Sequence, residues 1–172
     1  MLVAGVGNIF LSDDGFGSEV VRRMAGALHR DGMLPDGVEM VDFGIRGVHL
    51  AYQLLDGYDT LVVVDAAPRG QPPGTVSLLD VDPHEVGDTS AAVSDGQAPL
   101  VDAHGLEPGA ILSMLGSLGG SVSRVLVVAC EPESVEEGIG LSAVVQAAVP
   151  RAIELVNEVM RSETVSVEEV ST

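Results

Sequence analysis

The chain has 172 residues, 46% of them hydrophobic, and a mean hydropathy of +0.34, which is the composition of one folded domain and not of a disordered chain. Its formal net charge of −18 repels phosphate backbones and anionic lipid headgroups, so neither nucleic acid nor a membrane is an expected partner. The single cysteine, Cys130, excludes an intramolecular disulfide and a cysteine-rich zinc site.

Short apolar runs alternate with segments of helical periodicity along the chain. The first run, "LVAGV", begins next to Met1 with no basic region before it, so we expect no signal peptide and a cytoplasmic protein. Helical spacing follows in residues 15–29, and "DTLVVVDAA" is the strongest strand signal. The expected strands are 2–6, 37–43, 59–67, 75–81 and 124–130, and the expected helices are 15–29, 48–57, 106–118 and 142–161.

This alternation predicts an α/β fold, a three-layer sandwich around a central, mostly parallel, five-stranded sheet. The alternating segment 75–81 suits an antiparallel edge strand. We expect a single domain over residues 1–162 and an acidic, flexible tail over 163–172. The small, polar segment 82–102 has little structural signal, and we expect it to be a mobile loop.

The stretch "VAGVGNIFLSDDGFG" raises the possibility of a phosphate site, because a strand, a glycine turn and a helix often form one. It has the first two glycines of a dinucleotide fingerprint but not the third at the required spacing, and it lacks the P-loop lysine. The carboxylates of Asp13 and Asp14 would also occupy the helix start themselves. The sequence therefore favours helix capping, which we expect of Asp13, or cation binding, which we consider for Asp14.

Ligands of open parallel sheets bind outside the carboxyl ends of the strands. Asp65 ends a fully apolar strand, where a carboxylate needs a partner such as a cation, and His104 lies in a loop before a helix. Together with Asp14, these two carboxylates and one imidazole are a plausible ligand set for a divalent transition metal with positions left open for a substrate.

Five motifs, in this order, carry a family resemblance: "GVGNIFLSDDGFG", "VDFGIRG", "VVVDAAPRG", "PPGTV" and "DAHGL". Together they resemble the hydrogenase maturation proteases, endopeptidases that trim the C-terminus of the [NiFe]-hydrogenase large subunit. The resemblance covers nearly the whole chain and implies a phosphorylase/hydrolase-like fold and an aspartyl-type protease. It also implies that Asp14, Asp65 and His104 bind nickel and that Asp42 takes part in cleavage or in substrate contact.

The resemblance also implies where the nickel comes from: the precursor supplies it, and the protease does not hold it permanently. It further implies that the partner is the [NiFe]-hydrogenase large-subunit precursor. We expect the enzyme to act as a monomer. Two alternatives remain: a non-cleaving nickel-dependent chaperone or sensor that binds the precursor, and another hydrolase of similar architecture, of the spore or peptidyl-tRNA-processing type. The net negative charge argues against a peptidyl-tRNA-processing enzyme, because its RNA-linked substrate would be repelled.

Two departures from the family pattern concern the substrate. Position 14 is aspartate where many members have glutamate, which shortens the side chain by one methylene. The second motif reads "DFGIRG" where "DGGTxG"-type sequences are common, so Phe43 and Arg46 bear on substrate choice. Arg46 has two open roles: pairing with a carboxylate of the substrate or of a neighbouring aspartate, or an ordinary surface position.

Overall fold

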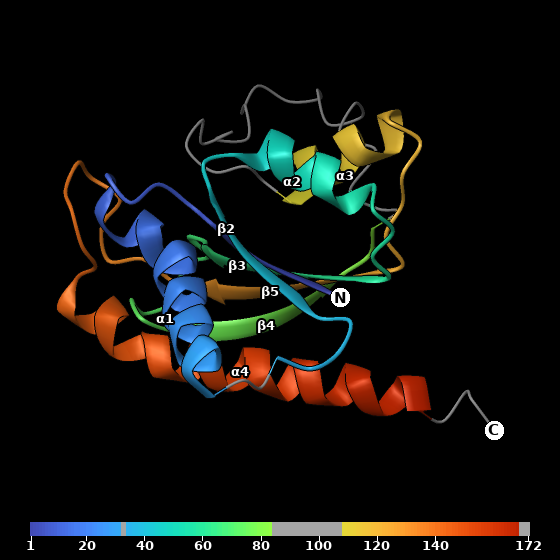
Figure 1. Ribbon diagram of the computed structural model, residues 1–172. Helices are drawn as coiled ribbons and strands as arrows, with labels where there is room; N and C mark the ends of the chain where they lie inside the picture. The colour runs from blue at the N-terminus through green and yellow to red at the C-terminus, as the bar shows by residue number, and fades with distance from the viewer. Residues whose placement is uncertain (32–33, 84–107, 169–172) are drawn as a thin grey trace.

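A computed structural model describes residues 1–31, 34–83 and 108–168 (Figure 1). In chain order its elements are β1 (Leu2–Val6), a 3₁₀ helix η1 (Ser12–Gly15), α1 (Phe16–Asp31), β2 (Glu39–Gly44), α2 (Gly47–Leu54), β3 (Thr60–Ala66), β4 (Val76–Val81), α3 (Pro108–Ser117), β5 (Arg124–Cys130) and α4 (Ala143–Glu168). The helices and strands follow the order predicted from the sequence, and α4 extends further than predicted, into the segment expected to be a tail.

The five strands form one sheet in the order β2-β1-β3-β5-β4. β1 pairs in parallel with β2 and β3, and β3 pairs in parallel with β5. β4 pairs antiparallel with β5 at the edge. The predicted fold class is confirmed: a mostly parallel, five-stranded sheet with one antiparallel edge strand.

Helices cover both faces of the sheet and give three layers (Figure 1). One buried cluster joins α1 and α4 to the sheet, with Phe16 and Val149 among its members. The other cluster lies on the opposite face, beneath α2 and α3, and includes Leu50 and Ile111. Because both faces are covered, β3 and β5 are nearly continuous apolar runs, as expected of central parallel strands.

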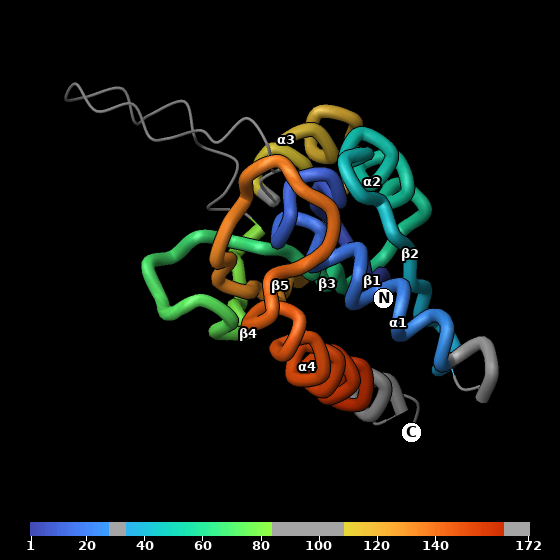
Figure 2. Tube along the Cα trace, turned by 90° about the vertical axis from the view of Figure 1, so that its left-hand side faces the viewer, coloured from blue at the N-terminus to red at the C-terminus, as the bar shows by residue number. Residues whose placement is uncertain are grey.

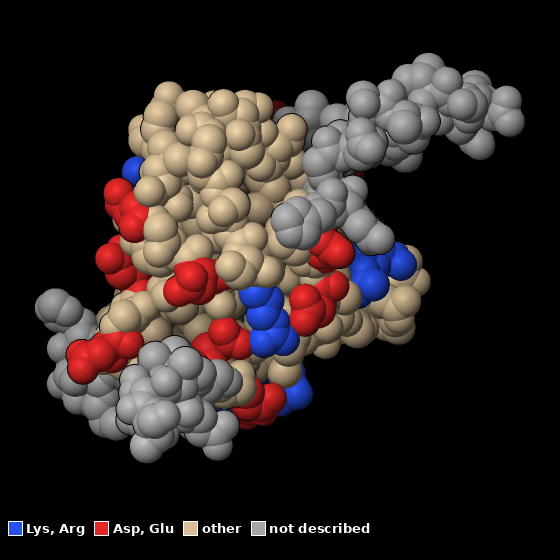
Figure 3. All heavy atoms as spheres, turned by 90° about the vertical axis from the view of Figure 1, so that its right-hand side faces the viewer, with Lys and Arg blue, Asp and Glu red and all other residues tan. Residues whose placement is uncertain are grey.

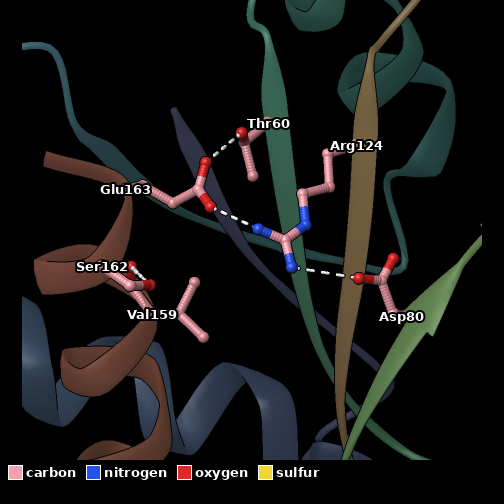
Figure 4. Close-up of polar contacts among 6 residues, drawn as sticks. All are labelled: Thr60, Asp80, Arg124, Val159, Ser162 and Glu163. Atoms are coloured by element: carbon pink, nitrogen blue, oxygen red, sulfur yellow. Dashed lines mark hydrogen bonds and ion pairs between the residues drawn. The ribbon is translucent and has the colours of Figure 1, made fainter. Parts of the chain in front are cut away.

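At the amino ends of the strands a polar network fastens α4 to the sheet (Figure 4). The Glu163 carboxylate accepts a 2.8 Å hydrogen bond from the Thr60 hydroxyl and a 2.6 Å bond from the Arg124 guanidinium. Arg124 also donates to Asp80, 3.0 Å away on β4. This network ties β3, β4, β5 and α4 together at the edge of the sheet opposite the site described below.

Charge is unevenly distributed between the two helical layers. The sequences of α2 and α3, within the described residues, contain no Asp, Glu, Lys or Arg. Figure 3 shows the face that lies on the right in Figure 1. Charged side chains, in red and blue, gather below an upper part that is largely tan. Within the described residues, no helix is both long and apolar enough to cross a membrane.

Candidate active site

The turn after β1 brings the first acidic pair to the carboxyl ends of the strands. Gly7 adopts a φ of +123°, and a Cβ atom there would collide with the carbonyl oxygen of Asp14 and lie 3.8 Å from Oδ1 of Asp65. Its N–H donates a 3.1 Å hydrogen bond to the carbonyl of Gly44 at the end of β2. Glycine is required here because a side chain would occupy the space between η1, β2 and β3.

Gly17, the second residue of α1, allows an equally close approach. A Cβ atom at this position would overlap the carbonyl oxygens of Val6 and Val64, at the ends of β1 and β3. The first turn of α1 therefore lies directly against the backbone of the two central strands. This contact fixes where η1, and with it Asp14, sits above the sheet.

The carboxylates of Asp14 and Asp65 lie close enough to interact electrostatically. Asp14 is buried in η1, and its Oδ2 accepts a 2.6 Å hydrogen bond from the N–H of Asn8. Burial, and then the negative charge of Asp14, raise the pKa of Asp65 from 3.8 to about 7, although a hydrogen bond from the Ala66 backbone acts in the opposite direction. Such a pair has the chemistry of a cation site, since a bound cation would favour the charged form of both groups.

The third predicted metal ligand, His104, lies outside the described residues, as do His84 and most of the 82–102 loop. Among the residues that are described, no group of three or more His, Cys, Asp and Glu side chains is arranged to hold a metal ion. The structure thus brings together two of the three predicted ligands, Asp14 and Asp65, and the full set stays a prediction.

Asp42 stands at the end of β2, next to the turn after β1. Its Oδ1 accepts a 2.7 Å hydrogen bond from the hydroxyl of Ser18 in α1 and a 3.1 Å bond from the N–H of Gly44. These two bonds hold the carboxylate in one orientation. Because Asp42 is exposed, the carboxylate also remains open to a substrate or to water. No sequence pattern indicates a role for Ser18, because its partner lies 24 residues away.

The expectation that Asp13 caps a helix is wrong. The N-cap position of η1 is Leu11, and Asp13 lies fully inside the protein. Its carboxylate accepts hydrogen bonds of 2.6 to 3.1 Å from the N–H groups of Glu133, Ser134 and Ser142 and from the hydroxyl of Ser142. Asp13 therefore anchors the segment between β5 and α4 to the turn that carries Asp14, as the orange segment over the blue turn in Figure 2 illustrates.

Glu131 plays a similar part on the next loop, and no sequence pattern indicates this role. This buried residue follows β5 directly, and its carboxylate accepts hydrogen bonds from the N–H groups of Arg69, at 2.7 Å, and Gly70, at 3.2 Å. The loop after β3 is thus fixed from the end of β5. A proline- and glycine-rich sequence with little periodicity becomes ordered because a buried acceptor holds its backbone.

Two residues of the "DFGIRG" motif have structural partners. Arg46 donates to the main-chain carbonyls of Asp42, at 2.7 Å, and Phe43, at 3.0 Å. Phe43 is buried in the cluster beneath α2. Arg46 therefore satisfies main-chain carbonyls at the end of β2, and it forms no ion pair with an aspartate among the described residues, whereas pairing with a substrate carboxylate stays open.

Cys130 is buried at the end of β5. Burial, together with the charges of Asp13 and Glu131, raises the pKa of its thiol to about 12. A thiol held neutral in this way is a poor nucleophile.

A doubly covered parallel sheet with paired carboxylates at its carboxyl edge defines an α/β enzyme domain with an acidic site. The family model for hydrogenase maturation proteases matches residues 21–159. The hydrogenase 2 maturation protease of Escherichia coli K12 is 33% identical over 162 residues, or 94% of this chain and 90% of that protein. The hydrogenase expression/formation protein HupD of Rhizobium leguminosarum bv. viciae is 33% identical over 97% of this chain and 77% of its own length.

The solved structures agree with the sequence relatives. The hydrogenase maturating endopeptidase HybD from Escherichia coli matches with a TM-score of 0.71 and 31% identity, covering 94% of this chain and 92% of that one. The chain therefore belongs to the hydrogenase maturation protease family and is an endopeptidase, which confirms the resemblance found in its motifs.

Proposed function

We propose that this endopeptidase removes the C-terminal extension of a nickel-loaded [NiFe]-hydrogenase large-subunit precursor. The observation that carries the proposal is the pairing of Asp14 and Asp65: burial, and then the negative charge of Asp14, raise the pKa of Asp65 to about 7. A site that is electrostatically unfavourable on its own, and becomes favourable when a cation enters, suits a protein that recognises a metal carried by another protein.

In this proposal Asp14, Asp65 and His104 complete the coordination of the precursor's nickel. Oxygen and nitrogen donors without a thiolate make a weak site for such a metal, so the isolated protein should hold little of it. An initially empty site is what a check on the precursor requires, because a resident nickel would let the enzyme cut a precursor that had none. When bound, the nickel polarises the scissile carbonyl or lowers the pKa of a water molecule.

Asp42 acts on the peptide in this scheme. Its carboxylate is oriented by Ser18 and Gly44 and stands exposed one strand away from β1, which supports a role as general base for the attacking water or as an acceptor for the peptide backbone. We further infer that the protein acts as a monomer in the cytoplasm. Its charge of −18 opposes self-association, and its single cysteine needs no oxidising compartment.

The test is to incubate the pure protein with precursor in nickel-loaded and nickel-free forms and to determine the mass of the product. We expect the C-terminal extension to be lost only from the nickel-loaded form, and metal analysis of the isolated protein to find well under one nickel per chain. Binding of the loaded precursor without any loss of mass would instead identify a non-cleaving chaperone or sensor. Cleavage of nickel-free precursor by a protein with tightly bound metal would identify an ordinary metalloprotease.

A further inference from the structure

A groove of about 470 Å³ adjoins the candidate site on the side of α1 and α4. Asp42 and Ser18 belong to it, so the groove is continuous with the candidate catalytic residue. Its remaining walls come from the loop after β1, from η1 and α1, from the segment between β5 and α4, and from the start of α4, and they include Ile9, Ile139, Leu141 and Gln146. Neither the predicted metal ligands nor the Asp42 assignment accounts for these four residues.

The mouth of the groove is apolar and exposed. Ile139 is 86% exposed and Ile9 is 52% exposed, and Phe10 next to it is 63% exposed. Single exposed apolar side chains are common, but three on two adjoining loops beside the candidate catalytic carboxylate form a patch of the kind that proteins use for binding. These side chains stand out in a chain with 26 acidic residues.

The two loops that carry these side chains are joined to each other. The N–H of Ser12 donates to the carbonyl of Gly138 at 3.0 Å, and the N–H of Gly138 donates to the carbonyl of Phe10 at 2.9 Å. Asp13 adds its four hydrogen bonds to the same junction. The apolar side chains are therefore presented by a backbone that is already ordered, which lowers the entropy lost on binding.

The opposite wall of the groove is polar. Glu19 in α1 is held by ion pairs with Arg22 and Arg23, and Asp42 is held by Ser18. Asp42 has no ion pair within the described residues, although it interacts electrostatically with Arg22, and its carboxylate is one of the acceptors that line the groove. The groove thus combines an apolar mouth with an oriented negative group on its polar wall.

We propose that this groove binds the extended segment of the precursor next to the cleaved bond, with a large apolar side chain against Ile9 and Ile139 and a main-chain N–H or basic group toward Asp42. The inference rests on the proposed function, since it takes the occupant to be the precursor. A second copy of this chain is a poorer occupant, because two molecules of charge −18 repel each other. The continuity of the groove with Asp42 also places its occupant where cleavage would occur.

The test uses Ile139→Ser and Ile9→Ser in the full chain, with nickel-loaded precursor as the probe. The matched controls are Leu55→Ser and Leu118→Ser, two side chains that are each 41% exposed and follow the C-terminal ends of α2 and α3, away from the groove. We expect each groove variant to raise KM about tenfold with kcat nearly unchanged, and each control to leave both constants within twofold. Thermal unfolding should be the same for all four, because exposed side chains contribute little to the core.

Binding of the precursor is measured separately from cleavage, so that the two proposals fail in different ways. If the wild-type protein binds the precursor but never cuts it, the proposed function is wrong, while weaker binding by Ile139→Ser would still support the groove. If both groove variants bind and cut like the wild type, the groove assignment is wrong and the proposed function stands. A wild-type dimer in sedimentation that dissociates on Ile139→Ser would identify a second copy as the occupant and would also overturn the assignment.

Discussion

The hydroxyl of Ser18 in α1 donates a 2.7 Å hydrogen bond to Oδ1 of Asp42 at the end of β2. This bond joins the helix that begins at the acidic turn to the strand that carries the candidate catalytic carboxylate. It leaves the exposed face of Asp42 directed at the groove, and it explains how an exposed carboxylate keeps a defined orientation.

Replacing Asp42 by asparagine should separate cleavage from binding. Asparagine keeps an acceptor for Ser18 and Gly44 but loses the charge and the ability to take up a proton, so we expect cleavage to fall by roughly 100-fold or more. Binding of nickel-loaded precursor, measured by its dissociation constant, should change much less. An equal loss of binding and cleavage would move Asp42 among the metal ligands.

The three predicted metal ligands should be individually essential. Asp14→Asn, Asp65→Asn and His104→Gln each remove a donor while nearly preserving volume, so we expect processing to be lost and thermal unfolding to remain cooperative. His49→Gln, on the exposed side of α2, is the control and should process precursor normally. Wild-type processing by two of the three ligand variants would refute the ligand set.

The raised pKa of Asp65 predicts how stability depends on pH. Its pKa is about 7 in the folded protein and 3.8 as the ordinary value, so the folded state favours the protonated form. The stabilisation of the folded state by protonated Asp65 is fully present below pH 3.8. It is lost as pH rises toward and through about 7, which lowers the free energy of unfolding by roughly 2–4 kcal/mol. In metal-free buffer, Asp65→Asn should therefore be more stable than the wild type at pH 8, and urea unfolding of both proteins at pH 5 and pH 8 measures the difference.

The difference in free energy of unfolding between the wild type and Asp65→Asn should change between pH 5 and pH 8. The same difference at both pH values would contradict this electrostatic account. Repeating the measurement with Asp14→Asn identifies the source. Removing the neighbouring charge should lower the pKa of Asp65 and leave only the part that burial causes.

Asp13 should prove to be a structural residue. Asp13→Ala leaves three partly buried N–H groups and one hydroxyl without their buried acceptor, which should cost roughly 2–4 kcal/mol in free energy of unfolding. Asp36→Ala, in an exposed turn, is the matched control and should change the stability by less than about 0.5 kcal/mol. Chemical denaturation measures both, and an unaffected Asp13→Ala variant would show that the loop before α4 is held by other contacts.

The sequence by itself determined the order of elements, the parallel sheet with its antiparallel edge and the positions of Asp14, Asp42 and Asp65 near strand and helix ends. These features depend on local periodicity and on the rule that parallel strands end at one edge, so no long-range contact is needed to predict them. Tertiary structure alone decided what surrounds each carboxylate. Asp13 accepts from residues 120 to 129 positions away, Glu131 from residues about 60 away, and Asp42 from a helix that follows a different strand. Aspartates 13 and 14 are neighbours with the same chemistry, and only the packing of η1 against β3 and the loop before α4 makes one a buried anchor and the other a partner of Asp65.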